Sequence, residues 1–227
     1  MRGSRRSRVH ITEDPNNKDD DYWEFDLTDM ADYDVPAMIE GIRYSRKKEG
    51  ADCNKVTIVA HSLGTMNTVT SLARSTHAQD YIQAVVLMEP CILPDATKYL
   101  PLGGIGYHTL SYLTWKFNID TIFGPHWRRQ RSLLCSALGW WSSACRELFS
   151  RALFGEDEES WSGPQEIPVK IGKHILQNHL RGEFQEYANY FNWGFRDAPD
   201  HKLEQISPEV PIRVLFASED KLCPPNT

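Results

Sequence analysis

The sequence predicts an α/β fold built on a parallel sheet, and three observations lead to this fold class. Residues 54–60 form an apolar, β-branched run typical of a buried strand, and residues 63–75 follow with apolar side chains at helical spacing. Residues 84–88 and 212–217 are further buried runs. The strand–helix–strand order over residues 55–90 implies a right-handed parallel crossover. Strands this apolar are typical of parallel sheets that helices cover on both faces.

The segment before the first strand contributes one helix. Residues 1–21 are polar and irregular. Asp34 is a residue type favoured at helix N-caps, and Pro36 is tolerated in the first turn of the helix that would follow. This helix is expected to end near Gly50.

The segment between the second and third strands predicts a separate cap. Residues 89–211 show no clear core strand and are rich in aromatic residues and helix formers; all tryptophans except Trp23 lie between residues 115 and 193. An insert of this length between two sheet strands predicts a mainly helical domain. Most of these aromatic side chains are expected to pack the cap's own core, and one or two to line an apolar tunnel. The predicted organisation is a core part at 1–90, a cap at 91–206 and a return to the core at 207–227.

Composition excludes several classes of protein. The 227 residues carry a net charge of −6, which gives no support for nucleic-acid binding. No apolar stretch approaches the roughly 18 residues of a membrane span, and no apolar region follows the N-terminal arginines as in a signal peptide. The five cysteines show no CxxC spacing, which argues against zinc. We expect Cys53 and Cys91 to act as small core residues, and no metal or cofactor to be needed.

The turn after the first strand carries the clearest chemical signal. A strand, then Ala60-x-Ser62-x-Gly64, then a helix is the pattern of the nucleophile elbow of the α/β-hydrolases. Such a turn strains the serine backbone, so the residues two before and two after it must be small. Alanine at position 60 replaces the usual glycine. The alternative is an ordinary Ser-Leu-Gly turn. His61 is expected to point elsewhere and not to act as the base.

A serine nucleophile also needs a base, a carboxylate that orients the base, and donors for the oxyanion. Asp220 follows the third strand, where these hydrolases place the acid, and Glu219 competes for that role. The backbone N–H of Leu63 is the expected oxyanion donor. No histidine lies between Asp220 and the end at Thr227, and a histidine from the cap is a lesser alternative. The sequence therefore predicts an incomplete hydrolase that lacks its base.

Several motifs resemble the acid lipases, the gastric and lysosomal group. The N-terminal signature Arg-Gly-x-x-x-Ser-x-x-His is specific, a Phe-Trp-x-Phe-like and an Asp-x-Pro-Ala-like block follow in the family's order, and the matches in the cap are looser. The matching positions are Arg2-Gly3, Ser7, His10, Tyr22-Trp23-Glu24-Phe25, Asp29-Met30-Ala31, Tyr33-Asp34-Val35-Pro36-Ala37, Phe123-Gly124, Leu133-Leu134-Cys135-Ser136 and Asn192-Trp193-Gly194.

The resemblance implies an α/β-hydrolase fold, with Ser62 as nucleophile, Asp220 as triad acid and Leu63 as oxyanion donor. It places the family's histidine beyond Thr227 and its second oxyanion loop before Met1, so both ends are expected to be truncated. It also implies a cap disulfide, for which Cys135 and Cys145 are a loose match. Members of the family are secreted or lysosomal.

The predicted function is hydrolysis of an apolar lipid ester, a triacylglycerol or a steryl ester, at a lipid–water interface. Two alternatives stay open: a short-chain carboxylesterase, and a non-catalytic lipid-binding or interaction protein on the same fold. If the chain is whole, the missing histidine predicts little or no esterase activity, because loss of one triad member costs orders of magnitude in rate.

Overall fold

The structure is a computed structural model in which the chain separates into two compact units. One unit is Met1–Glu24 with Thr97–Lys173, and the other is Phe25–Ala96 with His174–Thr227. The predicted division at 90 and 206 stays a prediction, and the compact units divide the chain at other positions. The residues that the structure describes are 9–17, 21–51, 55–92, 111–112, 114–116, 119–122, 166–188 and 198–218.

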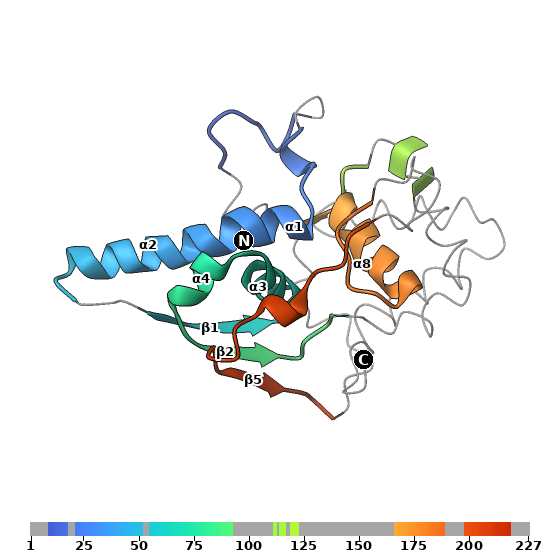
Figure 1. The fold of residues 1–227 in the computed structure, drawn as a ribbon. Coiled ribbons are helices and arrows are strands. Elements are labelled where there is room, and N and C mark those ends of the chain that lie inside the picture. The colour runs from blue at the N-terminus through green and yellow to red at the C-terminus, as the bar shows by residue number, and fades with distance from the viewer. Residues whose placement is uncertain are drawn as a thin grey trace. The chain divides into compact units, whose positions relative to one another are not determined.

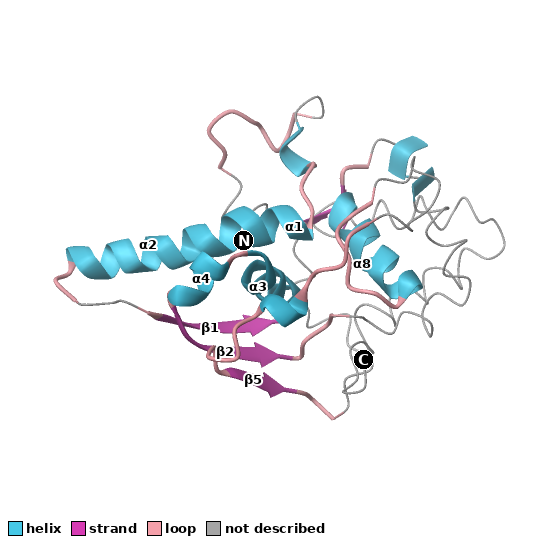
Figure 2. Cartoon of the chain, in the orientation of Figure 1, coloured by secondary structure: helices cyan, strands magenta, loops and turns pink. Residues whose placement is uncertain are grey.

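The second unit contains a three-stranded parallel sheet in the order β1-β2-β5. The strands are β1 at Val56–His61, β2 at Ile82–Met88 and β5 at Ile212–Leu215. Ala60 pairs with Leu87, and Leu87 pairs in turn with Val214. Figure 2 shows the three arrows pointing the same way. The predicted α/β fold with a parallel sheet is confirmed, and the carboxyl ends of the three strands meet at one edge.

Helices cover one face of this sheet. In Figure 1, α2 (Val35–Lys48), α3 (Leu63–Arg74) and α4 (Thr76–Asp80) lie on the same side of the strands. The core between them is closely packed, because Leu72 of α3 and Val85 of β2 are both 0% exposed. Burying side chains of this size from water supplies about 1.5–3 kcal/mol each. This core holds β1 and the start of α3 in place.

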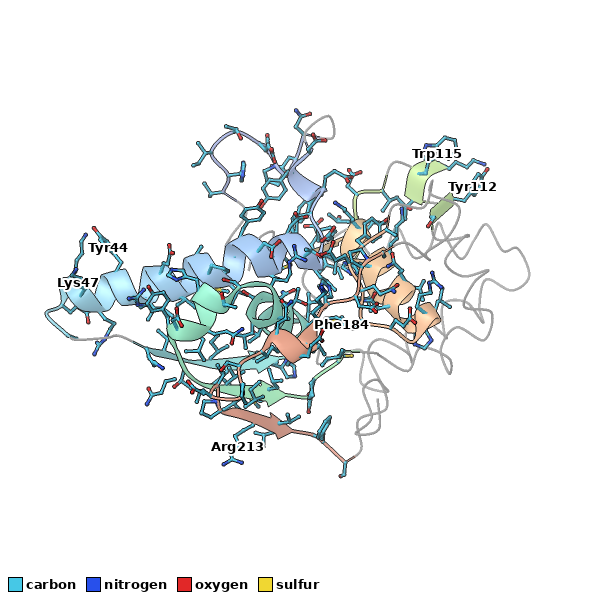
Figure 3. All side chains as sticks on the ribbon, viewed as in Figure 1. Tyr44, Lys47, Tyr112, Trp115, Phe184 and Arg213 are labelled. Atoms are coloured by element: carbon cyan, nitrogen blue, oxygen red, sulfur yellow. The ribbon has the colours of Figure 1, made fainter. Side chains whose placement is uncertain are left out.

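The opposite face of the sheet is open among the described residues. Val59 is 65% exposed, Met88 39% and Leu215 53%. The strand register places these side chains on the face that Arg213 shares, and Figure 3 shows Arg213 projecting from β5 away from the helices. Among the described residues, helices meet the expectation of cover on one face only. The crossover through α3 and the preceding α2 both run on that side.

The helix before β1 begins earlier than predicted. Asp26 is its N-cap, and its carboxylate accepts from the backbone N–H groups of Thr28 and Asp29. The Asp29 carboxylate accepts in turn from the Asp26 N–H at 2.9 Å. The chain then runs through α1 (Leu27–Asp29), a π-helical turn at Met30–Asp34 and α2 without a break.

Asp34 occupies the N-cap position of α2 with Pro36 in the first turn, as predicted, but it does not cap the helix through its side chain. Its backbone is helical, with φ −76° and ψ −44°, and its side chain makes no capping bond. Pro36 has no N–H to donate and would clash in the middle of a regular helix, but the π-helical turn ends just before α2 and leaves Pro36 near the start of regular α-helix.

The first unit is described only in parts. Trp23 packs edge-to-face on Tyr22 at 4.8 Å between ring centroids, and its Nε1 donates to the Pro15 carbonyl at 3.0 Å. Two short strands, β3 (Thr121–Ile122) and β4 (Ile167–Pro168), pair antiparallel. No clear strand was expected in this region, and both are too short to give a sequence signal. Helix α8 spans Val169–Arg181 and crosses the boundary between the units.

Candidate active site

Ser62 occupies a strained turn between β1 and α3. Its backbone has φ +50° and ψ −120°, the angles of the first central residue of a type II′ turn, where glycine is favoured. Such a conformation costs a non-glycine residue of order 1–3 kcal/mol. Among the described residues, Glu89 at φ +49° is the other non-glycine with positive φ. The sequence prediction of a strained turn at Ser62 therefore matches the backbone that the structure gives.

Hydrogen bonds fix the backbone on both sides of Ser62. The Ser62 N–H donates to the Met88 carbonyl at 3.2 Å, which ties the turn to the end of β2. The Ser62 carbonyl accepts from the Thr65 N–H at 2.9 Å and from the Thr65 hydroxyl at 2.5 Å. The Thr65 Oγ1 in turn accepts from the Cys91 N–H at 3.4 Å. The turn is therefore held by the helix that follows it and by the segment after β2.

The residues flanking Ser62 have the small size that the turn requires. Ala60 is 6% exposed at the end of β1, and Gly64 is buried in the first turn of α3. Leu63, the expected oxyanion donor, is the first residue of α3. Its backbone N–H is one of the first N–H groups of a helix, which have no partner within the helix and lie at the positive end of the helix dipole.

The side chain of His61 contacts the side chain of Glu89. Its Nε2 is 2.8 Å from the Glu89 Oε2, and both side chains are substantially exposed. The Glu89 N–H donates to the Leu215 carbonyl at 2.7 Å, so the residue after β2 is tied to β5 as well as to β1. Glu89 and Thr65 escaped the sequence analysis. A threonine three residues after the serine that precedes a helix, and an acidic residue directly after a parallel strand, were the available signals.

The far end of α3 is fixed by an ion-pair network. Arg74 donates through Nε and Nη2 to the two carboxylate oxygens of Asp32, at 2.7 and 2.9 Å, and its Nη1 pairs with Glu186. The hydrogen bond to Asp32 is the main cause that raises the pKa of Arg74 above its usual value, and Glu186 adds to it against the effect of burial. A bidentate guanidinium–carboxylate pair fixes orientation as well as distance.

Two histidines of the second unit are buried. His174 is 0% exposed, and its Nε2 is 2.7 Å from the Gln185 carbonyl oxygen. His201 is 6% exposed and its ring lies 4.7 Å from that of Phe184, but neither of its nitrogens has a hydrogen-bond partner within the described chain. Burial is the main cause that lowers the pKa of His201 to about 4, and repulsion from His174 and Arg74 adds to it.

Several predicted residues lie outside the described part of the chain. These are Asp220, its competitor Glu219, and the cysteines Cys53, Cys135 and Cys145. Cys91 is buried at 8% exposure, as expected, but it is disulfide-bonded, which the sequence did not indicate.

Two described aromatic residues of the predicted cap, Tyr112 and Trp115, are solvent-facing, whereas Phe184 is buried. Trp115 is 76% exposed and Tyr112 52%, with ring centroids 6.2 Å apart. Figure 3 shows both on the same short segment. The expectation that the cap's tryptophans mostly pack its core does not hold for Trp115.

The described residues contain neither a metal-binding cluster nor a helix that could span a membrane. Within these ranges, no group of three or more histidine, cysteine, aspartate or glutamate side chains is placed to hold a metal ion. No described helix combines the length and apolar character that crossing a bilayer requires.

The chain is similar to proteins named lipases, although no family model matches it. It is 32% identical over 97% of its length to a probable lipase of Schizosaccharomyces pombe, covering 48% of that protein. It is 24% identical over 99% of its length to lipase 1 of Drosophila melanogaster, covering 51%. A second probable lipase of S. pombe is 27% identical over 63% of the chain and is covered to 28%.

The chain thus spans about half the length, or less, of the curated relatives that it matches. The expectation that it lacks both ends stays a prediction, as does its assignment to the acid lipases in particular. The parallel sheet with its helices agrees with the α/β-hydrolase fold that lipase relatives imply. The similarity supports a lipase family for this chain.

Proposed function

We propose that this chain carries the nucleophile of a lipid ester hydrolase, with Ser62 as the attacking residue. The observation that carries the proposal is the backbone of Ser62, at φ +50° and ψ −120°, at the carboxyl edge of a parallel sheet and directly before a helix. A serine is strained there unless something over-determines the turn, and such outliers cluster at active sites. The lipase names of the relatives supply the substrate class.

The proposed reaction is acyl transfer to Ser62 followed by hydrolysis. The Ser62 Oγ attacks the acyl carbonyl, the alcohol leaves with a proton, and water then releases the fatty acid from the acyl-enzyme. The Leu63 N–H stabilises the oxyanion from the start of α3. Asp220 is the acid that orients a histidine base, and that histidine is not among the residues after Asp220 in this sequence. A triacylglycerol or steryl ester of the acid-lipase type is the substrate we propose.

Labelling with a fluorophosphonate tests the nucleophile directly. We expect stoichiometric labelling of Ser62, because a serine nucleophile attacks the phosphorus of the probe through its Oγ and displaces fluoride. Mass spectrometry should place the adduct on Ser62, and Ser62→Ala should abolish it. Ser75→Ala is a matched control, because Ser75 follows the other end of α3 and serves there as the N-cap of α4. A folded chain that is labelled on another serine, or on none, would contradict the proposal.

A second candidate is a lipid-binding protein on the same fold that does not hydrolyse its ligand. The hydrolase and the lipid-binding protein are distinguished by measuring ligand binding and covalent modification of Ser62 separately. A catalytic chain forms a covalent adduct at Ser62, whereas a binding protein retains a non-hydrolysable cholesteryl ether or trialkylglycerol and shows the same affinity after Ser62→Ala. A short-chain carboxylesterase would instead hydrolyse p-nitrophenyl butyrate faster than p-nitrophenyl palmitate.

A further inference from the structure

Thr65 is the residue through which the strained turn is connected to the rest of the sheet. It is 0% exposed, and its hydroxyl makes two hydrogen bonds at once. It donates to the Ser62 carbonyl at 2.5 Å and accepts from the Cys91 N–H at 3.4 Å. One buried hydroxyl therefore joins the turn after β1 to the segment after β2.

The Ser62 carbonyl matters because it shares a peptide unit with the Leu63 N–H. The peptide bond is planar and trans, so the carbonyl and the N–H point in opposite directions across a single rigid plane. Whatever fixes the Ser62 carbonyl thereby fixes the direction of the Leu63 N–H. The Ser62 ψ of −120° is the torsion that sets this plane.

We infer that Thr65 is a positioning residue that aims the Leu63 N–H at the oxyanion. Its hydroxyl holds the Ser62 carbonyl toward the body of α3, and the opposite edge of the same peptide plane then presents the Leu63 N–H to the solvent side of the turn. The inference rests on the proposed role of Ser62. It adds a residue that touches neither substrate nor nucleophile side chain but determines the direction of the donor.

The segment that receives the second bond is itself well fixed. The Glu89 N–H donates to the Leu215 carbonyl at 2.7 Å, and Cys91 is buried and disulfide-bonded. The Ser62 N–H also reaches this segment through the Met88 carbonyl. Thr65 therefore transfers the rigidity of the sheet's carboxyl edge to the Ser62–Leu63 peptide, and it does so out of contact with water.

Thr65→Val tests this inference, because valine has nearly the same shape and no hydroxyl. Fluorophosphonate labelling of Ser62 should slow by about tenfold in the maximal rate of inactivation, less than the roughly hundredfold or greater loss that follows outright removal of an oxyanion donor. The probe concentration at half-maximal rate should stay unchanged. Thr65→Ser restores the hydroxyl and should recover the rate to within about threefold.

Thr70→Val is the matched control. Thr70 is also on α3 and 0% exposed, but its hydroxyl has no hydrogen-bond partner within the described residues. We expect its labelling rate to equal that of the unaltered chain. Equal rates for Thr65→Val and the unaltered chain would overturn the inference, and so would a similar loss in Thr70→Val.

A second readout does not depend on any reactivity of Ser62. Glycine adopts the Ser62 backbone angles without strain, so Ser62→Gly should raise the melting temperature. If Thr65 holds the turn in its strained form, the gain from Ser62→Gly should shrink by at least half in a Thr65→Val background. An undiminished gain would overturn the inference. A chain that is never labelled, but in which the gain shrinks, would refute the proposed function and keep the positioning role.

Discussion

Replacing His201 with phenylalanine should remove a large part of the chain's sensitivity to acid. The pKa of His201 is lowered to about 4, mainly by burial and further by electrostatic interaction with His174 and Arg74, against the opposing effect of Asp26 and Asp32. In the unfolded chain the same ring has its ordinary pKa of 6.5. Between pH 6.5 and about pH 4, this ring is protonated in the unfolded chain and neutral in the folded chain.

The sign of the effect follows from that difference. Because the unfolded state binds more protons, the free energy of unfolding rises with pH through this window. The contribution of a neutral His201 is complete above pH 6.5, falls as the pH drops, and is lost once the pH is below about 4.

The magnitude follows from the two pKa values. A tenfold difference in proton affinity is worth about 1.4 kcal/mol, so the gap between 6.5 and about 4 is worth about 3 kcal/mol. Some access of water to the ring makes this an upper value. Over the narrower interval from pH 7 to pH 5, the expected loss is about 2 kcal/mol.

Urea unfolding at pH 7 and pH 5 measures this loss. In His201→Phe the difference between the two pH values should be smaller than in the unaltered chain by about 2 kcal/mol. Stability at pH 7 should change little, because neither ring nitrogen has a hydrogen-bond partner to lose among the described residues and the ring already packs on Phe184.

His201→Gln is the companion variant, because it also lacks a titrating ring but keeps a polar group. It should share the reduced pH sensitivity while being less stable than His201→Phe at both pH values. Equal losses between pH 7 and pH 5 in the unaltered chain and in both variants would refute the reasoning, since the folded chain would then bind the proton as readily as the unfolded one.

Two further predictions concern an ion pair and a helix cap in the second unit. Arg74→Lys should lower the free energy of unfolding by about 1 kcal/mol and Arg74→Ala by about 2 kcal/mol. Lysine keeps the charge but loses the pair of hydrogen bonds to Asp32. A lysine variant as stable in urea as the unaltered chain would show that the pair of bonds adds nothing beyond the charge. Asp26→Ala should cost about 1 kcal/mol in the same urea titration through loss of the capping box before α1, and an unchanged free energy of unfolding would count against the box.

The sheet strands were predictable because their signal is local. Each is a short apolar run bounded by turn residues, and the crossover through α3 follows from their order. The earlier helical start at Asp26 was missed because Asp26 and Asp34 are the same residue type. What distinguishes them is the hydrogen bond that the Asp26 N–H donates to the Asp29 carboxylate, and the π-helical turn that precedes Pro36. Both depend on backbone geometry.

The candidate site was predictable in the same uneven way. Ser62, Ala60 and Gly64 form a pattern of adjacent residues, so the sequence is enough to single them out. Thr65 bonds to the Cys91 N–H, and His61 to Glu89, across the gap between two strands. Contacts of this kind depend on the strand register, which cannot be inferred from the sequence. The disulfide of Cys91 was missed for the same reason.

The backbone of Ser62 has an evolutionary consequence. A residue held at φ +50° and ψ −120° is a standing cost of about 1–3 kcal/mol, and one substitution to glycine removes it. A lineage that no longer used the hydroxyl would gain stability by that single step, at a position where no fold requirement opposes it. Because glycine would fit this backbone without strain, what serine adds at this position is its side chain, and not a conformation that the fold needs from it.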